Sequence, residues 1–327
     1  MLTNTARFLN LHYKDLMNTL ITKLTEKWNK ASFNRTLRKV RHTAPLQYSK
    51  DDKITVVSMV GHQTLEMYLV AVKSFMNNFG NANIEAIDDG SLTEEDRATL
   101  SHHVPGIAFS MAAEIDTHGC PTYISWRRLF RIIAISQHSY VIQLDSDIVA
   151  LSPLVEVYRK AAANEGFMIA DGKWRELVDT KFMSAIAKRL PLRHPQTMAE
   201  QIFDELPEFS GDQRYLRGCA GFAGYPQGSL SIERVKALSD AIEAKISRPV
   251  WERWGSEQTA TNALISLSNN PEVLPWPRYQ NHGFPYNYES QGAAALIHFI
   301  GSKRFLDTTY RDLVKLFCKN ETSQYED

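Results

Sequence analysis

The sequence predicts an α/β fold: a Rossmann-type mixed, mainly parallel sheet with helices on both faces. Short apolar runs rich in β-branched residues alternate with longer segments of helical periodicity. This alternation is typical of chains in which a helix connects each parallel strand to the next. Two of the runs end in paired aspartates, which places charge at the sheet edge where such folds bind ligands.

The alternation is clearest between residues 53 and 147. Strands are expected at 54–60, 84–87, 107–111 and 140–144, and helices at 65–79, 93–100 and 123–136. Thr93 and Asp96 form a capping pattern at the start of one of these helices. Further helices are expected at 154–164, 179–189, 231–246 and 257–267, with glycine-rich and aromatic loops at 218–224 and 280–288.

The first 45 residues differ in character from the rest. Nine of them are lysine or arginine, whereas Asp15 and Glu26 are the only acids. Six apolar residues recur there at helical spacing, namely Leu9, Tyr13, Leu16, Leu20, Leu24 and Trp28. We expect a basic amphipathic helical segment over residues 1–45 and one α/β domain over 46–327. The segment has two open roles: peripheral contact with a membrane surface, or docking on its own domain or on a second subunit in a dimer.

Composition excludes several classes of protein. Apolar residues make up 43 % and charged residues 23 %, as in ordinary globular proteins. Basic and acidic residues number 37 each, which argues against a dedicated nucleic-acid binder. Three scattered cysteines give neither a disulfide framework nor a zinc site. With no apolar signal region and no run of about 18 apolar residues, the expected location is the cytoplasm, with membrane association left open.

Asp145-Ser146-Asp147 directly follows the expected strand at 140–144. Side chains at positions i and i+2 leave a strand on the same side. Two carboxylates so close repel each other unless a cation lies between them. Hard divalent cations bind carboxylates and bridge to substrate phosphates. The motif therefore predicts a metal site, although a solvated turn after a strand is the alternative.

A second motif lies at residues 296–304. His298 stands between apolar residues, where a histidine is either part of the core or a third metal ligand. An imidazole beside two carboxylates suits Mn²⁺ better than Mg²⁺. Gly301 allows backbone to approach a ligand closely, and the cations of Lys303 and Arg304 are expected to neutralise a diphosphate.

Together these motifs resemble those of the metal-dependent, GT-A-fold glycosyltransferases, particularly the glycogenin and lipopolysaccharide galactosyltransferase group. That group carries a strand-end Asp-x-Asp, an Arg-Leu pair before it, an Asp-Gln pair followed by Asn, and a late His-aromatic-x-Gly with a basic residue. The matching residues are Asp145, Asp147, Arg128-Leu129, Glu257-Gln258 with Asn262, and His298-Phe299 with Gly301. Three positions depart from it: Cys219 replaces the Asn of an Asn-x-Gly segment, Glu257 replaces Asp, and Arg304 stands for the late lysine.

The resemblance implies a GT-A-like domain over residues 46–327 that acts as a hexosyltransferase. It would transfer a sugar from a nucleoside diphosphate sugar, with a UDP-sugar expected, to a glycan, lipid or protein acceptor. It implies Mn²⁺ or Mg²⁺ held by Asp145, Asp147 and His298, and a catalytic centre containing Gln258 and Glu257. Contacts with the nucleotide sugar are expected from Asp88, Asp89, Arg128, Asp145, Gly221, Lys303 and Arg304.

Plainer roles stay open for several of these residues. Asp88 and Asp89 also suit a surface turn, Arg128 a solvated helix position, and Glu257-Gln258 an exposed helix start. Aromatic residues crowd positions 276–288, where they are expected either to stack on an acceptor sugar or to pack on the core.

Other functions remain as alternatives. Asp145-x-Asp147 also suits a phosphohydrolase of the haloacid dehalogenase type, although the second half has no clear late Gly-Asp pair with an acidic residue a few places on, which that chemistry needs for Mg²⁺. A non-catalytic nucleotide-sugar-binding protein of the same fold is a second alternative. A nucleotidyltransferase would want a glycine-rich basic loop after the first strand, where the chain has Gly61-His62-Gln63.

Overall fold

The computed structural model describes residues 22–170, 173–209, 213–283, 293–301 and 303–323. The chain forms two compact units, one of Met1–Ala44 with Phe299–Asp327 and the other of Pro45–His298. The last helix thus groups with the N-terminal segment. Within the described ranges, every helix is too short or too polar to span a lipid bilayer.

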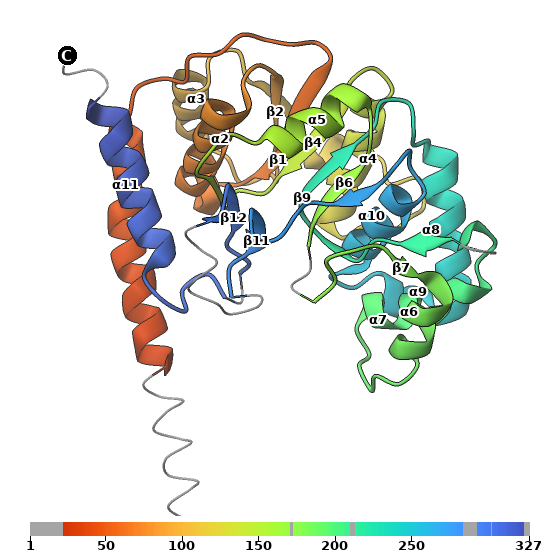
Figure 1. Ribbon diagram of the computed structural model, residues 1–327. Helices are drawn as coiled ribbons and strands as arrows, with labels where there is room; N and C mark the ends of the chain where they lie inside the picture. The colour runs from red at the N-terminus through yellow and green to blue at the C-terminus, as the bar shows by residue number, and fades with distance from the viewer. Residues whose placement is uncertain (1–21, 171–172, 210–212, 284–292, 302, 324–327) are drawn as a thin grey trace, which may run out of the picture. The chain divides into compact units, whose positions relative to one another are not determined.

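A seven-stranded sheet forms the centre of the Pro45–His298 unit (Figure 1). Its order is β10-β6-β9-β4-β1-β2-β3. Four neighbouring pairs are parallel, whereas β9 runs antiparallel to β4 and β6. The strands are β1 (Ile54–Val60), β2 (Asn83–Asp88), β3 (Ala108–Met111), β4 (Tyr140–Leu144), β6 (Phe167–Ala170), β9 (Gly218–Tyr225) and β10 (Glu272–Val273). The predicted mixed, mainly parallel sheet is confirmed.

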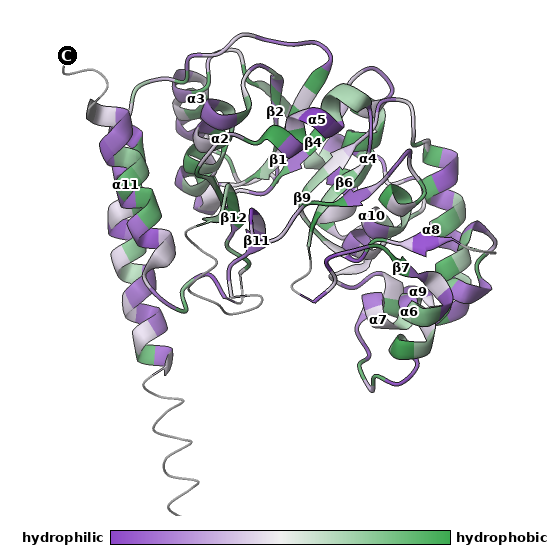
Figure 2. Cartoon of the chain, viewed as in Figure 1, coloured by the Kyte–Doolittle hydropathy of each residue, from purple (hydrophilic) through white to green (hydrophobic). Residues whose placement is uncertain are grey.

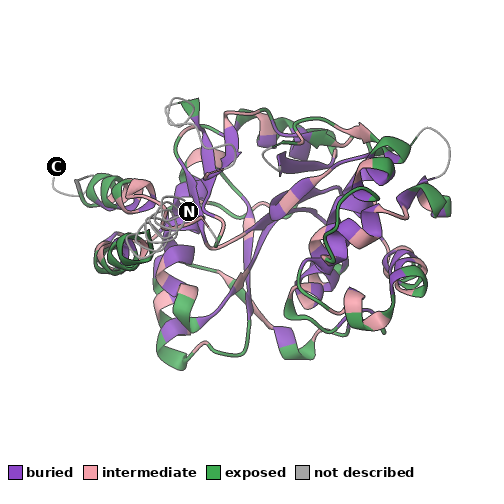
Figure 3. Cartoon of the chain, turned by 90° about the horizontal axis from the view of Figure 1, so that it is seen from below, coloured by how far each residue is buried: buried purple, intermediate pink, exposed green. Residues whose placement is uncertain are grey.

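Helices cover the sheet on both faces, and Figure 3 shows the buried strands between them. Helix α4 packs on β1 and β4, and α10 packs on β9 and β6. β4 is buried along its whole length, as expected of a strand covered on both sides. The helices are α2 (Leu65–Phe79), α3 (Glu94–His103), α4 (Ile124–Ser136), α5 (Val155–Ala163), α6 (Thr180–Ala187), α7 (Pro195–Glu200), α8 (Ile232–Ile246), α9 (Arg248–Trp251) and α10 (Ser256–Ser266).

A three-stranded sheet brings the end of the α/β unit to its middle, next to the Asp-x-Asp motif. It consists of β5 (Ile148–Ala150), β12 (Leu296–His298) and β11 (Tyr279–Asn281). β12 pairs antiparallel with β5 so that His298 lies opposite Ile148. Since Ile148 directly follows Asp147, this register carries His298 to the Asp-x-Asp motif. A two-residue pair, β7 (Val178–Asp179) with β8 (Arg214–Tyr215), lies apart from both sheets.

The expected loop at 218–224 is wrong, because these residues form the central strand β9. The glycines in this segment led to the loop prediction, since glycine is uncommon inside strands. The structure gives the reason for them: a Cβ on Gly224 would overlap Tyr140 and Phe167, and one on Gly221 would overlap the ring of His298. Sequence alone does not show such contacts. The predicted bounds of β1, α2 and β4 are confirmed to the residue.

The other unit has its own small core. A helix over residues 22–37 is followed by the 3-10 turn η1 (Arg38–His42), and α11 is Thr309–Ser323. Phe33 is buried, with its ring centroid 4.3 Å from that of Tyr310 and 5.3 Å from that of Phe305. Asn29 Nδ2 donates a hydrogen bond to the Phe305 carbonyl. Figure 2 shows hydrophilic and hydrophobic residues side by side along α11, as in an amphipathic helix.

Candidate metal and donor site

Asp145, Asp147 and His298 form one cluster. One ligand atom from each lies within 4.8 Å of the other two. His298 Nε2 is 3.2 Å from Asp147 Oδ1 and 3.9 Å from Asp145 Oδ2. His298 and Asp147 are buried, while Asp145 keeps 28 % of its side chain exposed. The cluster is therefore mostly buried, and Asp145 is its solvent-accessible member.

The electrostatics of the cluster favour a cation. Burial, together with repulsion from Asp147, raises the pKa of the Asp145 carboxyl, although Arg128 opposes this. Burial would lower the pKa of His298, but the Asp147 carboxylate outweighs it and holds that pKa well above 6.5. A divalent cation between the two acids would relieve their repulsion.

The donor set fits such a cation. Two carboxylates and one imidazole are ligands that Mn²⁺ accepts. Adjacent ligand atoms around an octahedral ion with bonds of about 2.1 Å lie about 3 Å apart. The separation between His298 and Asp147 is already close to this, and a small adjustment of Asp145 would complete the set.

His298 is held by residues of distant segments. Its Nδ1 lies 2.9 Å from Asn281 Oδ1 and 3.5 Å from Cys219 Sγ. When Nδ1 donates to Asn281, Nε2 is the nitrogen that would bind a cation in place of its proton, as in second-shell contacts of metal-bound histidines. Gly221 makes room for the ring. Asn281 was not predicted as a site residue, because its strand pairs with that of His298 only in the folded chain.

Arg128 connects the cluster to Glu257. Its guanidinium bonds to Asp145 Oδ1 and lies 3.5 Å from Glu257 Oε1. Both Arg128 and Glu257 are buried, so neither is a solvated surface residue. Burial raises the pKa of Glu257 to about 7, against the opposing effect of Arg128. Arg128 thus orients one oxygen of Asp145 away from His298 and leaves the other facing it.

Two hydrogen bonds hold the side chain of Gln258 in place. Its Oε1 accepts from the Ala220 amide at 3.3 Å, and its Nε2 donates to Gln196 at 3.2 Å. Gln196 in turn donates to the buried carboxylate of Glu200. Glu257 and Gln258 both lie in the first turn of α10. No sequence pattern points to Gln196 and Glu200, because their contact with α10 is tertiary.

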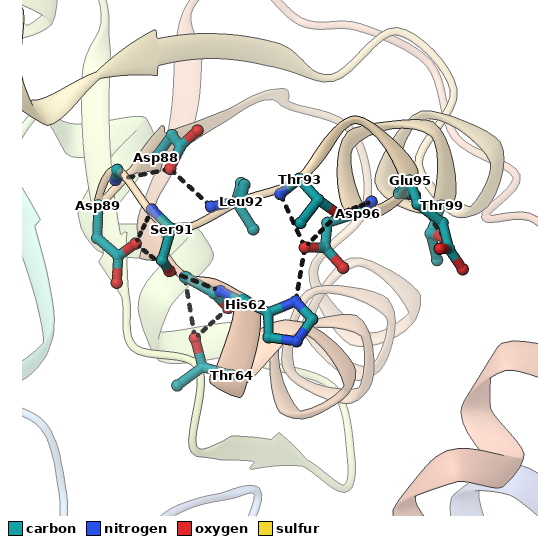
Figure 4. A network of polar contacts seen from close by, with 12 residues as sticks. His62, Thr64, Asp88, Asp89, Ser91, Leu92, Thr93, Glu95, Asp96 and Thr99 are labelled. Atoms are coloured by element: carbon teal, nitrogen blue, oxygen red, sulfur yellow. Dashed lines mark hydrogen bonds and ion pairs between the residues drawn. The ribbon is translucent and has the colours of Figure 1, made fainter.

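Asp88 and Asp89 behave differently from each other (Figure 4). Asp88 is fully buried, and one of its oxygens accepts hydrogen bonds from the amides of Gly90 and Leu92. Its other oxygen accepts from Arg97. Asp89 is exposed, and one of its oxygens accepts from Ser91. Asp88 therefore shapes the loop after β2, while Asp89 presents a carboxylate at the sheet edge.

The remaining predicted residues belong to the other unit or to the segment at 276–288. Gly301, Lys303 and Arg304 belong to the unit of Met1–Ala44 with Phe299–Asp327, where Arg304 Nε donates to the Phe299 carbonyl. Of the expected acceptor aromatics, Tyr279 is buried and donates to Glu156. Phe284, Tyr286 and Tyr288 lie outside the described residues.

No family model matches the chain, and no curated protein matches it by sequence. Solved structures do. The galactosyltransferase LgtC, in complex with donor and acceptor sugar analogues, matches with a TM-score of 0.53 and 13 % identity, over 81 % of this chain and 95 % of LgtC. The bifunctional glycosyltransferase WbbM matches with a TM-score of 0.51 and 14 % identity, over 86 % of this chain and 53 % of WbbM, so this chain spans about half of that protein.

These similarities, together with the sheet order, define the fold of the chain. It is the GT-A fold of glycosyltransferases. An Asp-x-Asp pair and a histidine that could hold a metal ion lie together in this fold.

Proposed function

We propose that this protein transfers a sugar from a nucleoside diphosphate sugar, with a divalent cation held by Asp145, Asp147 and His298. The convergence of these three side chains is the observation that carries the proposal. Asp145 and Asp147 follow the carboxyl end of β4, the edge at which α/β sheets bind ligands. A bound divalent cation stabilises the negative charge that develops on a departing diphosphate.

Other side chains would orient the metal ligands and bind the donor. Asn281 and Arg128 orient His298 and Asp145. Gln258, fixed by Gln196, would lie near the reacting sugar. The exposed Asp89 would hydrogen-bond the nucleoside.

The finer assignments follow the sequence resemblance. We propose UDP as the nucleotide, a glycan or lipid-linked acceptor, and Mn²⁺ as the preferred cation, because it accepts mixed nitrogen and oxygen ligands. One of the matching structures is of an active-site glutamine mutant of LgtC, which supports testing Gln258 as a residue of the reaction centre.

Calorimetry of UDP binding, with and without Mn²⁺, tests the proposal. Tight binding is expected only with the metal, and it is expected to be lost in Asp147→Ala. Lys53→Gln, an exposed change, serves as the control. Metal-independent binding that survives Asp147→Ala would overturn the assigned site.

A panel of nucleotide sugars then separates the alternatives. Metal-dependent sugar release or transfer is expected for one donor. Binding without turnover would instead identify a nucleotide-sugar-binding protein. Phosphate release from sugar phosphates that disappears in Asp145→Asn would identify a phosphohydrolase.

A further inference from the structure

The helix over residues 22–37 presents two large apolar side chains to solvent. Leu24 is 65 % exposed and Trp28 is 61 % exposed. They lie one turn apart and, by helical geometry, roughly opposite Phe33 and Leu37, the buried side of the same helix. The core of this unit therefore does not use them, and exposed apolar groups that lie together usually mark a contact site.

Basic groups lie beside this pair on the exposed part of the helix, where helical geometry places Lys27 next to Leu24 and places Lys23 and Lys30 farther round, toward the buried side. Lys23, Lys27 and Lys30 are exposed, and they line a cavity of about 290 Å³ together with Glu26, Gly301 and Phe305. The guanidinium carbon of Arg311 lies 5.8 Å from the centre of the Trp28 ring. Glu26 is the only acid between residues 22 and 37, against Lys23, Lys27, Lys30 and Arg35.

We propose that Leu24, Trp28, Lys23, Lys27 and Lys30, here called the basic-apolar face, dock the protein peripherally on an anionic lipid surface. Tryptophan and leucine enter the boundary between headgroups and acyl chains, where a ring that is part apolar and part polar is favoured. The lysines attract the lipid phosphates, since basic residues next to a membrane bind anionic headgroups.

A second copy of the chain fits this face less well. In a symmetric dimer the same patch meets itself, which would bring the lysines of two helices together at a cost in repulsion. Two exposed apolar side chains also supply much less area than the roughly 800 Å² per partner of a stable interface. Charge complementarity thus favours lipid.

Flotation of the full chain with vesicles tests the proposal. We expect binding to vesicles that contain phosphatidylglycerol, and little to pure phosphatidylcholine. Lys23→Gln/Lys27→Gln/Lys30→Gln should weaken binding roughly 100-fold, at about fivefold per lysine. Leu24→Ser/Trp28→Ser should weaken it at least about tenfold through lost apolar burial. All five positions are exposed, so both variants are expected to fold.

Matched variants in the other unit complete the test. Tyr158→Ser/Leu192→Ser removes apolar groups that are 58 % and 55 % exposed, and Lys53→Gln/Lys181→Gln/Arg189→Gln removes three exposed cations. Neither should change flotation. The proposal is overturned if the wild-type chain does not float, or if both sets of variants behave alike. It also fails if light scattering shows a dimer that Leu24→Ser/Trp28→Ser dissociates. None of these outcomes depends on sugar transfer.

Discussion

His298 owes its position to residues that are distant in the sequence. Asn281 faces one ring nitrogen and Asp147 the other, while Gly221 leaves space for the ring. Asn281 supplies a hydrogen-bond acceptor, Asp147 a negative charge, and Gly221 the absence of a Cβ. Single substitutions can therefore remove them one at a time.

Asn281→Leu should weaken Mn²⁺ binding about 10- to 100-fold, as loss of second-shell contacts does in metal sites. The reason is that Nδ1 loses the acceptor that fixes the ring. Asn281→Asp keeps an acceptor, but it sets an oxygen against the Ala170 carbonyl, to which Asn281 donates. We therefore expect Asn281→Asp to lower the melting temperature yet retain metal affinity. Calorimetry and thermal unfolding separate the two effects, and equal losses of metal affinity in both variants would refute the positioning role.

Gly221→Ala places a Cβ where the imidazole of His298 lies. Because β9 is held on both sides by β4 and β6, we expect the ring rather than the strand to move. Mn²⁺ affinity, measured by electron paramagnetic resonance, should then fall at least about tenfold, comparable to a lost second-shell contact. Cys219→Ala, which removes only the more distant sulfur, is the control. Unchanged affinity in Gly221→Ala would show that the site tolerates a displaced ring.

At the scale of elements, the N-terminal cap of α3 also holds the loops that follow β1 and β2. Helix α3 begins with Thr93 and Asp96 bonded reciprocally, as their spacing predicts. The Asp96 carboxylate also accepts from His62 Nδ1 at 2.7 Å, which joins the segment after β1 to the one after β2 (Figure 4). This contact spans two loops, and the capping pattern alone does not reveal it.

Asp96→Ala should lower the free energy of unfolding by about 1–2 kcal/mol near neutral pH, as loss of a helix cap does. Burial would raise the pKa of Asp96, but hydrogen bonds from Thr93 and His62 outweigh it and hold the pKa below 3.8. A lowered folded pKa contributes stability above the unfolded value, and that contribution is lost as pH falls through the folded pKa. Urea unfolding should show the difference from wild type shrinking below pH 3.8. Glu95→Ala, an exposed neighbour in the same turn, should show less than half the effect.

At the scale of the whole molecule, the two compact units carry different groups. All three candidate metal ligands belong to Pro45–His298. The basic-apolar face belongs to the unit of Met1–Ala44 with Phe299–Asp327. Because each unit has its own buried core, damage to one is expected to leave the chemistry of the other intact.

Phe33→Ala tests this separation. Removing a buried ring that contacts Tyr310 and Phe305 should cost about 3–5 kcal/mol. We expect faster hydrogen exchange in residues 22–44 and in α11, with unchanged exchange in β1 and β4 and unchanged Mn²⁺ affinity. Parallel loss of metal binding would show that the two units are coupled.

Local patterns determined much of this protein. The alternation of apolar runs and helical periods predicted β1, α2 and β4 to the residue, because hydrophobic periodicity and helix caps act over a few positions. The Asp-x-Asp and the late histidine were likewise visible as ligand types. The positions of these residues in the sequence, however, do not show how far apart their side chains lie in the folded chain.

Tertiary structure decided the rest. It made residues 218–225 a central strand, since Gly221 and Gly224 suit close neighbours that only the fold supplies. It placed His298 beside Asp147 through the pairing of β12 with β5, and it set Asn281 behind the ring. It also joined the C-terminal helix to the N-terminal segment. Side chains from segments more than a hundred residues apart meet only when strands pair. The sequence therefore showed the candidate ligand residues, and the pairing of β12 with β5 brought them together in one site.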